Sequence, residues 1–186
     1  MTKTIGIIGL AGSGKSFAAD YLIQKYDFKG ICLDQVGHQV LREKAVIDWI
    51  GYSFGKDILQ GGQVNRKALG TIVFQDASAL KKLNSFVHPI LIERAKTQIL
   101  ESKENLVIQG ALLIDFELDA FCDVVIGMIA DFESIANFSG PKQWSITGSQ
   151  DHLLQQLDAV EIKIHNHFDE LRLYQQLDQK LAAYLH

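Results

Sequence analysis

The eight residues GLAGSGKS at positions 9–16 constrain the fold of this chain more than any other stretch. They follow TIGIIG, a short apolar run rich in isoleucine that predicts a buried strand over residues 4–9. The residues after them, FAADYLIQKY, place apolar side chains at helical intervals and predict a helix. GLAGSGKS therefore joins a strand to a helix, and it fits the pattern G-x-x-x-x-G-K-[ST] of a phosphate-binding loop.

Such a loop binds phosphate mainly through its backbone. Glycines let the chain turn tightly and direct successive N–H groups inward, where the positive end of the following helix adds to the cradle. Lys15 is expected to be catalytic by neutralising the β- and γ-phosphates, and the Ser16 hydroxyl is expected to bind Mg²⁺. The expected nucleotide-binding residues are Gly9, Ala11, Gly12, Ser13, Gly14, Lys15 and Ser16. A glycine-rich turn without a ligand is the alternative, which the strand before it and the helix after it disfavour.

Composition and charge exclude several classes of protein. The 186 residues are 47% hydrophobic and carry a net charge of −4, which suits one globular domain and offers no basic field for nucleic acid. No apolar run is long enough to span a membrane, and the N-terminus lacks the layout of a signal peptide.

Cys32 and Cys122 make neither a disulfide framework nor a zinc site, so we expect a cytoplasmic protein. No Asn-Lys-x-Asp run selects guanine, which favours a small-molecule kinase over a GTPase.

Strands and helices alternate along the chain. Besides residues 4–9, short apolar runs predict strands at 31–33, 106–110, 123–130 and 160–166. Helical patterns occupy residues 16–26, 36–55, 65–76, 77–102 and 169–185. Proline cannot donate to a helix, so a break is expected at His88-Pro89. The alternation predicts an α/β fold of three layers resembling the P-loop nucleoside kinases, with a parallel sheet of about five strands.

One domain over residues 1–186 is expected, with two special parts. The helical stretch between the second and third strands is too long for one crossover, so it predicts an inserted helical substrate lobe over about residues 36–103. The stretch SGPKQWSITGSQ, with its glycines and proline, predicts an irregular loop and thus a lid over about residues 131–150. A plain surface connection is the alternative for this loop.

Four further stretches resemble the dephospho-coenzyme A kinase family. They are LDQVGHQVL at 33–41, FGKDILQGGQVNRKALGTIVFQD at 54–76, LKKLNSFVHPIL at 80–91 and ALLIDFELDAFCDVVI at 111–126. With GLAGSGKS they cover most of residues 5–126 in the order of the family. The resemblance implies a P-loop core, a helical lobe for coenzyme A precursors and a mobile lid. It also implies that ATP, with Mg²⁺, phosphorylates the ribose 3′-hydroxyl of dephospho-coenzyme A.

The resemblance also implies roles for four further residues. Asp34 matches an acid that accepts the proton of the ribose hydroxyl or orients it, although an acid after a strand also fits a helix N-cap. Asn65 and Arg66 match an Asn-Arg pair, and a guanidinium suits the pyrophosphate of the acceptor. Asn65 fits a helix N-cap equally well, and Arg66 an ion pair with a neighbouring acid. His88 matches a substrate-binding histidine, with a structural role as the alternative.

The sequence departs from the family in several places. The expected lid contains Lys142 but no arginine, whereas the lid of the family carries arginines that clamp phosphates. Gln109 stands where members often have an acid near the metal, and Asp115 is a candidate to replace that acid. Phe17 follows the serine of the loop, where small residues are usual. Asn166 resembles an asparagine that the family places near the adenine, although a turn asparagine is the favoured interpretation.

Three functions remain open at this point. The first is phosphorylation of dephospho-coenzyme A by ATP. The missing lid arginines motivate a second, a catalytically weak or silent relative that binds ATP or coenzyme A precursors. The third is a kinase for another small molecule, such as a nucleoside monophosphate. Neither a nucleic acid nor a membrane is expected as a partner, and the sequence does not determine the oligomeric state.

Overall fold

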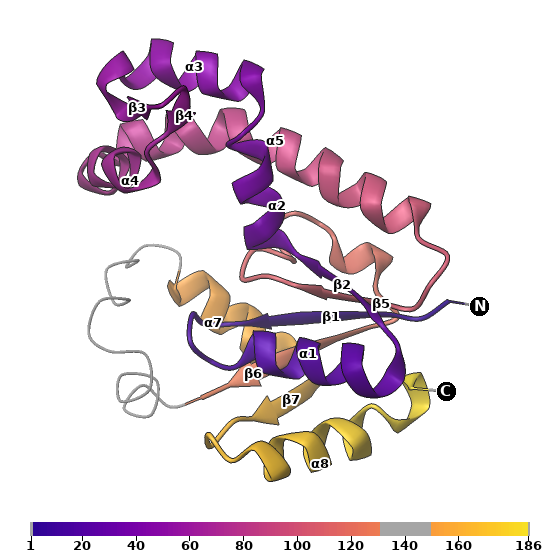
Figure 1. Ribbon diagram of the computed structural model, residues 1–186. Helices are drawn as coiled ribbons and strands as arrows, with labels where there is room; N and C mark the ends of the chain where they lie inside the picture. Colours follow the sequence, from indigo (N-terminus) through magenta and orange to yellow (C-terminus); the bar gives the residue numbers. More distant parts are fainter. Residues whose placement is uncertain (1, 131–149, 186) are drawn as a thin grey trace. The chain divides into compact units, whose positions relative to one another are not determined.

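The structure is a computed structural model that describes residues 2–130 and 150–185 (Figure 1). The chain forms two compact units. The core unit consists of Met1–Leu33 and Gln98–His186, and the helical unit consists of Asp34–Thr97. Within the described ranges, no helix is both long enough and apolar enough to cross a membrane.

A parallel sheet of five strands, in the order β2-β5-β1-β6-β7, forms the centre of the core unit. The strands are β1 (Thr4–Gly9), β2 (Lys29–Cys32), β5 (Leu106–Gln109), β6 (Val124–Ile129) and β7 (Ile162–His165). All four neighbouring pairs run parallel, and every residue of the central strand β1 is buried. An isoleucine-rich run such as β1 suits a strand covered on both faces. The predicted fold class is confirmed, and β7, the last strand, lies at an edge of the sheet.

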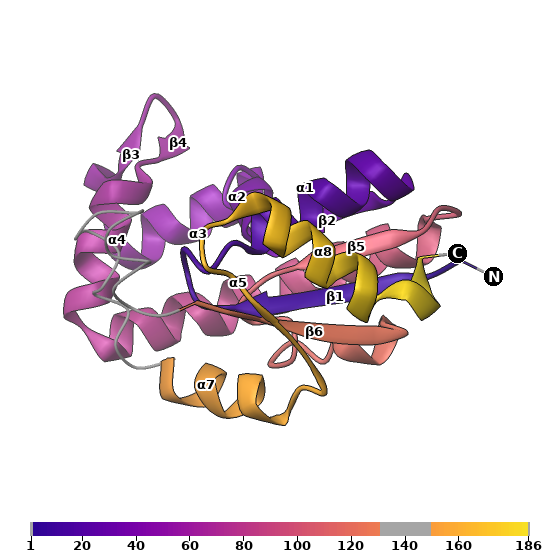
Figure 2. The same cartoon turned by 90° about the horizontal axis from the view of Figure 1, so that it is seen from below.

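Helices cover both faces of this sheet (Figure 2). Helix α1 (Lys15–Tyr26) and helix α8 (Glu170–Lys180) lie on one face, and α7 (Gln150–Ala159) lies on the other. Short 3₁₀ turns occupy Asp119–Phe121 and Ala182–Tyr184, so the predicted last helix ends earlier than expected. The resulting arrangement has three layers, with the sheet in the middle.

The core between the sheet and helices α1 and α8 is made of interlocking aliphatic side chains. Its members include Ile5, Ile7, Val107, Ile126, Met128 and Ile164 from the strands, and Ala18, Ala19, Leu22, Leu173 and Leu177 from the helices. The two alanines let the backbone of α1 approach the sheet closely, which sets where its N-terminus lies. Burying each large aliphatic side chain stabilises the fold by about 1.5–3 kcal/mol.

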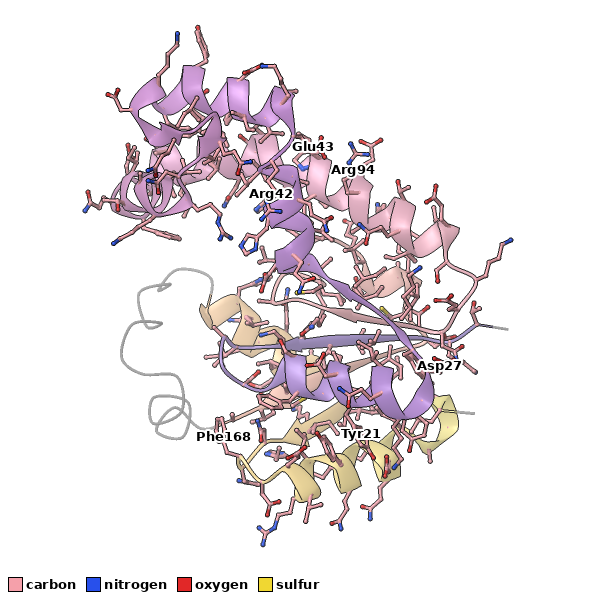
Figure 3. All side chains as sticks on the ribbon, in the orientation of Figure 1. Tyr21, Asp27, Arg42, Glu43, Arg94 and Phe168 are labelled. Carbon is pink, nitrogen blue, oxygen red and sulfur yellow. The ribbon has the colours of Figure 1, made fainter. Side chains whose placement is uncertain are left out.

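The helical unit contains four helices and a small hairpin. They are α2 (Leu33–Val40, whose first residue still belongs to the core unit), α3 (Lys44–Phe54), a 3₁₀ turn (Lys56–Ile58), β3 (Leu59–Gln60), β4 (Gln63–Val64), α4 (Arg66–Gln75) and most of α5 (Ala77–Glu101). Arg94 of α5 donates two hydrogen bonds to Glu43, the residue before α3, at 3.0 and 3.3 Å (Figure 3).

Two features of the helical unit differ from the sequence prediction. The helix predicted over 36–55 is two helices, because Arg42 and Glu43 bond back to Gln39 and Val40 and the chain then extends at Glu43. The β3–β4 hairpin was not predicted. Its turn holds Gly61 and Gly62 at φ 59° and 76°, a left-handed pair that joins antiparallel strands with two residues.

The predicted break at His88-Pro89 is wrong. Helix α5 is continuous, with Pro89 inside it. An internal proline costs a helix about 3 kcal/mol, because it removes one hydrogen bond and crowds the preceding turn. Packing on both sides of the proline offsets this cost: Val87 and Leu91 are buried on one face, and the ring of Phe86 stacks on Trp49 at 3.9 Å. Tertiary contacts, which the local sequence does not contain, thus hold the helix together.

Two expected regions have no structural test. The helical unit spans Asp34–Thr97, but its role as a substrate lobe over 36–103 stays a prediction. Residues 131–149 of the predicted lid lie outside the described residues. Residue 150 begins α7, which was not predicted as a helix.

Candidate active site

The loop between β1 and α1 has the backbone of an anion cradle. Gly12 and Gly14 adopt φ of 80° and 96°, which L side chains rarely tolerate. Gly14 directly precedes α1, so no side chain caps the first turn of the helix. A phosphate can therefore accept hydrogen bonds from the first N–H groups of α1, where the helix dipole is positive.

Lys15 lies folded back over this loop. Its Nζ donates to the carbonyl oxygens of Gly9 and Leu10, each at 2.8 Å. These two bonds hold the ammonium group within the loop, against neutral carbonyl oxygens. Phosphate oxygens would make stronger, charge-assisted bonds to the same ammonium.

Ser16, the second residue of α1, lies beside Gln109, the last residue of β5. Its Oγ donates to Gln109 Oε1 at 3.2 Å, and Gln109 is the last residue of β5, which pairs with β1. Two side-chain oxygens thus meet at the position expected for Mg²⁺. Within the described ranges, no group of three or more His, Cys, Asp or Glu side chains could hold a metal.

Asp115, the candidate to replace an acid at position 109, has partners on α7. Its Oδ1 accepts from Gln156 Nε2 at 2.9 Å and lies 3.0 Å from His152 Nδ1. These contacts tie the turn after β5 to α7. The carboxylate therefore links these two elements, and metal binding by Ser16 stays a prediction.

Asn166 lies beneath the loop, and only 5% of its surface is exposed. Its Nδ2 donates to the carbonyl of Ser13 at 3.1 Å, while its Oδ1 accepts from Phe168 N at 2.8 Å. The favoured interpretation as a turn asparagine is therefore correct but incomplete. The contact with the loop was missed, although carboxyl ends of parallel strands meet at one edge and a polar residue after the last predicted strand is a signal for it.

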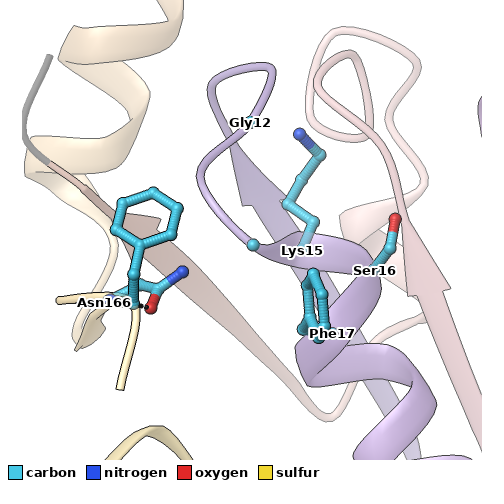
Figure 4. A pocket seen from close by; sticks show the side chains of 7 residues that line it. Gly12, Lys15, Ser16, Phe17 and Asn166 are labelled. Carbon is cyan, nitrogen blue, oxygen red and sulfur yellow. Dashed lines mark hydrogen bonds between the residues drawn. The ribbon is translucent and has the colours of Figure 1, made fainter. Parts of the chain in front are cut away.

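A cavity of about 160 Å³ opens at the loop (Figure 4). It is lined by Gly12, Gly14, Lys15, Ser16, Phe17, Asn166 and Phe168. Four of the seven predicted nucleotide-binding residues are thus brought together. Gly9 contributes a carbonyl to Lys15, Ser13 is buried with its carbonyl on Asn166, and Ala11 is exposed. None of these three lines the cavity.

The other predicted site residues belong to the helical unit. Asp34 is exposed in the first turn of α2, and Arg66 is exposed at the start of α4. Asn65 is the N-cap of α4, because its Oδ1 accepts from Lys67 N and Ala68 N, both at 3.1 Å. His88 lines a groove of about 550 Å³ along α5. The roles of these four residues in substrate binding and catalysis stay predictions.

Comparison with known proteins identifies the family. The family model described as dephospho-CoA kinase matches residues 3–157. A dephospho-CoA kinase of Latilactobacillus sakei is 30% identical, with 100% of this chain and 98% of the relative covered. The chain belongs to the dephospho-CoA kinase family. As a member it is a transferase, an ATP-dependent kinase that phosphorylates dephospho-coenzyme A to coenzyme A.

Two further comparisons agree with this family. A dephospho-CoA kinase of Borreliella burgdorferi is 29% identical over 97% of this chain and 88% of the relative. The solved structure of the dephospho-CoA kinase from Campylobacter jejuni covers 98% of this chain and 97% of its own at a TM-score of 0.66. Its sequence identity is 19%, so this likeness concerns the fold.

Proposed function

We propose that this family member transfers the γ-phosphoryl group of ATP to the ribose 3′-hydroxyl of dephospho-coenzyme A, with Lys15 and Asp34 as its catalytic residues. The observation that carries the proposal is the position of Lys15, which lines one cavity together with Gly12, Gly14 and Ser16. A cation, backbone amides and a helix N-terminus converge there. This combination suits the triphosphate tail of a nucleotide.

Lys15 is proposed to change partners when ATP binds. Its two bonds to the carbonyls of Gly9 and Leu10 give way to bonds with β- and γ-phosphate oxygens. The exchange is favourable because a hydrogen bond between two ionised groups is about twice as strong as one to a neutral acceptor. The ammonium then neutralises the charge of the group in transfer.

Ser16 and Gln109 fit a Mg²⁺ ion, because both offer side-chain oxygens and Mg²⁺ prefers oxygen ligands. A site with only a few protein ligands is sufficient for Mg²⁺, because this ion keeps several waters and also binds substrate phosphates. When bound, it neutralises charge on the β- and γ-oxygens. Gln109 thus takes the place of the acid expected in the family but contributes no charge.

The acceptor is proposed to meet residues of the helical unit. Asp34 orients the 3′-hydroxyl and accepts its proton. Arg66 pairs with the pyrophosphate of dephospho-coenzyme A, and a guanidinium fork suits such an anion. Asn65 acts through Arg66, because its cap fixes the start of α4. His88 contacts the acceptor from its groove on α5.

Mass spectrometry of the acceptor tests this function. The protein is incubated with ATP, Mg²⁺ and dephospho-coenzyme A, and we expect the acceptor to gain the mass of one phosphate. Lys15→Ala and Asp34→Asn are each expected to slow the gain by about 100-fold or more. Asp48→Asn is the matched control, because Asp48 is an exposed carboxylate of the helical unit paired only with Lys44 in its described contacts.

The outcomes separate the proposal from its alternatives. Absence of phosphate on dephospho-coenzyme A, with ATP still bound through Lys15, would identify a silent relative. A mass gain confined to a nucleoside monophosphate would identify a different kinase. Unchanged turnover in Lys15→Ala would show that the loop at residues 9–16 does not bind the phosphates of ATP.

A further inference from the structure

A groove of about 550 Å³ runs along one face of α5, within the helical unit. Pockets for small molecules have volumes of about 300–1,000 Å³, and most combine an apolar lining with a few polar groups. The α5 groove has such a lining, from residues that recur at the intervals of three and four typical of one helix face. They include Leu80, Lys81, Asn84, Ser85, Pro89 and Ile92.

Pro89 opens a main-chain acceptor in this groove. Proline has no N–H, so the carbonyl of Ser85, four residues earlier, lacks the donor that any other residue at position 89 would supply. The hydroxyl of Ser85 is engaged elsewhere, because it donates to the carbonyl of Lys82 at 3.0 Å. Pro89 is exposed and lines the groove together with Ser85. An N–H group of a ligand can therefore take the place of the missing helical donor.

Asn84 adds a polar side chain next to this carbonyl. It is half-buried, and its amide makes no hydrogen bond to residues 2–130 or 150–185. The amide can therefore both donate to a ligand and accept from it. Lys81 brings a positive charge, and none of the described residues that line the groove is acidic. Leu80 and Ile92, both half-buried, supply apolar surface.

The acceptor of the proposed reaction contains a group that matches these features. The pantetheine arm of dephospho-coenzyme A carries two secondary amides, a carbon with two methyl groups and, at one end, the anionic pyrophosphate. Each amide offers one N–H and one carbonyl, as a peptide group does. The adenosine part has an amine and hydroxyls but no such amide. An open main-chain carbonyl beside apolar surface therefore favours the arm over the nucleoside.

We propose that the α5 groove binds the pantetheine arm, with the carbonyl of Ser85 accepting from an amide N–H of the arm and Asn84 bonding to an amide group. The inference rests on the proposed function, which pairs the pyrophosphate with Arg66 of the same unit. The groove then distinguishes dephospho-coenzyme A from nucleotides that lack the arm. It also gives Pro89 a role that the packing of α5 does not require.

Pro89→Ala tests the proposal, because alanine supplies the missing N–H to the carbonyl of Ser85. Denaturant unfolding of the full chain should show a higher midpoint, since α5 gains a bond and loses a helix-breaking residue. The KM for dephospho-coenzyme A at saturating ATP and Mg²⁺ should nevertheless rise about fivefold, with kcat little changed, because an amide of the arm loses its partner. Asn84→Ala should raise the same KM by a similar factor.

A truncated ligand and a matched variant are the controls. The methyl ester of ADP keeps the adenosine and pyrophosphate of the acceptor but lacks the arm. Its inhibition constant against dephospho-coenzyme A should be the same in the parent, Pro89→Ala and Asn84→Ala. Thr97→Ala also introduces a better helix former into α5, at an exposed position outside the groove, and should keep the KM of the parent.

Each result decides between defined outcomes. A loss of affinity for dephospho-coenzyme A alone supports the proposal. An equal loss for the methyl ester, or an unchanged KM in Pro89→Ala and Asn84→Ala, overturns it while leaving transfer to the 3′-hydroxyl in place. If the chain binds the acceptor without phosphorylating it, calorimetric dissociation constants make the same comparison. If the unaltered protein neither bound nor phosphorylated dephospho-coenzyme A, the proposed function and this inference would both be wrong.

Discussion

The side-chain amide of Asn166 donates to the main-chain carbonyl of Ser13, 3.1 Å away, and so connects the end of the last strand to the phosphate loop. Asn166 itself is fixed by a bond from its N to the carbonyl of Ile129 at 2.8 Å. β6 lies between β1 and β7 in the sheet. The shape of the loop therefore depends on a residue 153 positions away in the sequence.

Replacement of Asn166 should loosen the loop. In Asn166→Asp the acceptor for Phe168 N remains, but an oxygen replaces the donor and faces the carbonyl of Ser13. We expect a loss of about 1–3 kcal/mol in the free energy of unfolding, because a buried carbonyl loses its partner, together with weaker ATP binding. Denaturant titration and calorimetry measure the two effects. A variant as stable as the parent would show that the bond does not support the loop.

Gly14 should tolerate no side chain, for two separable reasons. Its φ of 96° is unfavourable for other residues, and a Cβ there would collide with Nδ2 of Asn166. Gly62, in the β3–β4 turn, also has a positive φ, 76°, but open space around the position of a Cβ. Gly62→Ala should therefore cost only the backbone term of about 1–2 kcal/mol, and Gly14→Ala should cost more.

Denaturant unfolding of these two variants makes the comparison. Gly14→Ala should also lose ATP binding, whereas Gly62→Ala should keep it because Gly62 lies in the helical unit, in the turn between β3 and β4. Equal losses of stability would mean that the collision with Asn166 is relieved by a small shift and does not constrain the loop.

The charge at position 109 should set the Mg²⁺ requirement. Gln109 Oε1 accepts from Ser16 Oγ, and a carboxylate in the same place would keep that bond and add charge. Because the charge of the ligands tunes cation affinity, Gln109→Glu should lower the Mg²⁺ concentration for half-maximal phosphoryl transfer, and Gln109→Ala should raise it, each by several-fold. Activity measured against Mg²⁺ at saturating ATP checks this. Identical curves for all three proteins would exclude position 109 from metal binding.

Asp178 should make the fold sensitive to acid. Burial raises the pKa of its carboxyl group, but hydrogen bonds from Lys25, Tyr26 and Tyr21 at 2.7–2.8 Å outweigh that effect and leave the pKa below its usual value. A carboxyl group whose pKa is lower in the folded state stabilises the fold above its unfolded pKa of about 4. This stabilisation is lost as the pH falls from about 4 through the folded pKa.

Unfolding free energies measured between about pH 2 and pH 6 test this expectation. Asp178→Asn should be less stable than the parent at pH 6, because the network joining α1 to α8 loses its anion, and the difference should shrink toward acid pH. Asp48→Asn should keep the acid dependence of the parent, since Asp178 is intact. A constant difference at every pH would contradict the assignment.

Features that depend on neighbouring residues could be predicted from the sequence. GLAGSGKS between an isoleucine-rich strand and a helix predicted the anion loop, and short apolar runs predicted all five strands of the sheet, because turn chemistry and periodicity are local properties. The long family-specific string also predicted the family. Even the hairpin at Gly61-Gly62 was present as a local signal, although it was not recognised.

Features that depend on contacts between distant segments could not be predicted in this way. Pro89 lies within a continuous helix because Phe86, Val87 and Leu91 are held by other elements. Asn166 reaches Ser13 because the strand order β1-β6-β7 brings the ends of remote segments to one edge. The physical reason is that the cost of a helix-breaking residue and the partner of a buried amide are set by packing, and the pattern of neighbouring residues does not record which segments pack together.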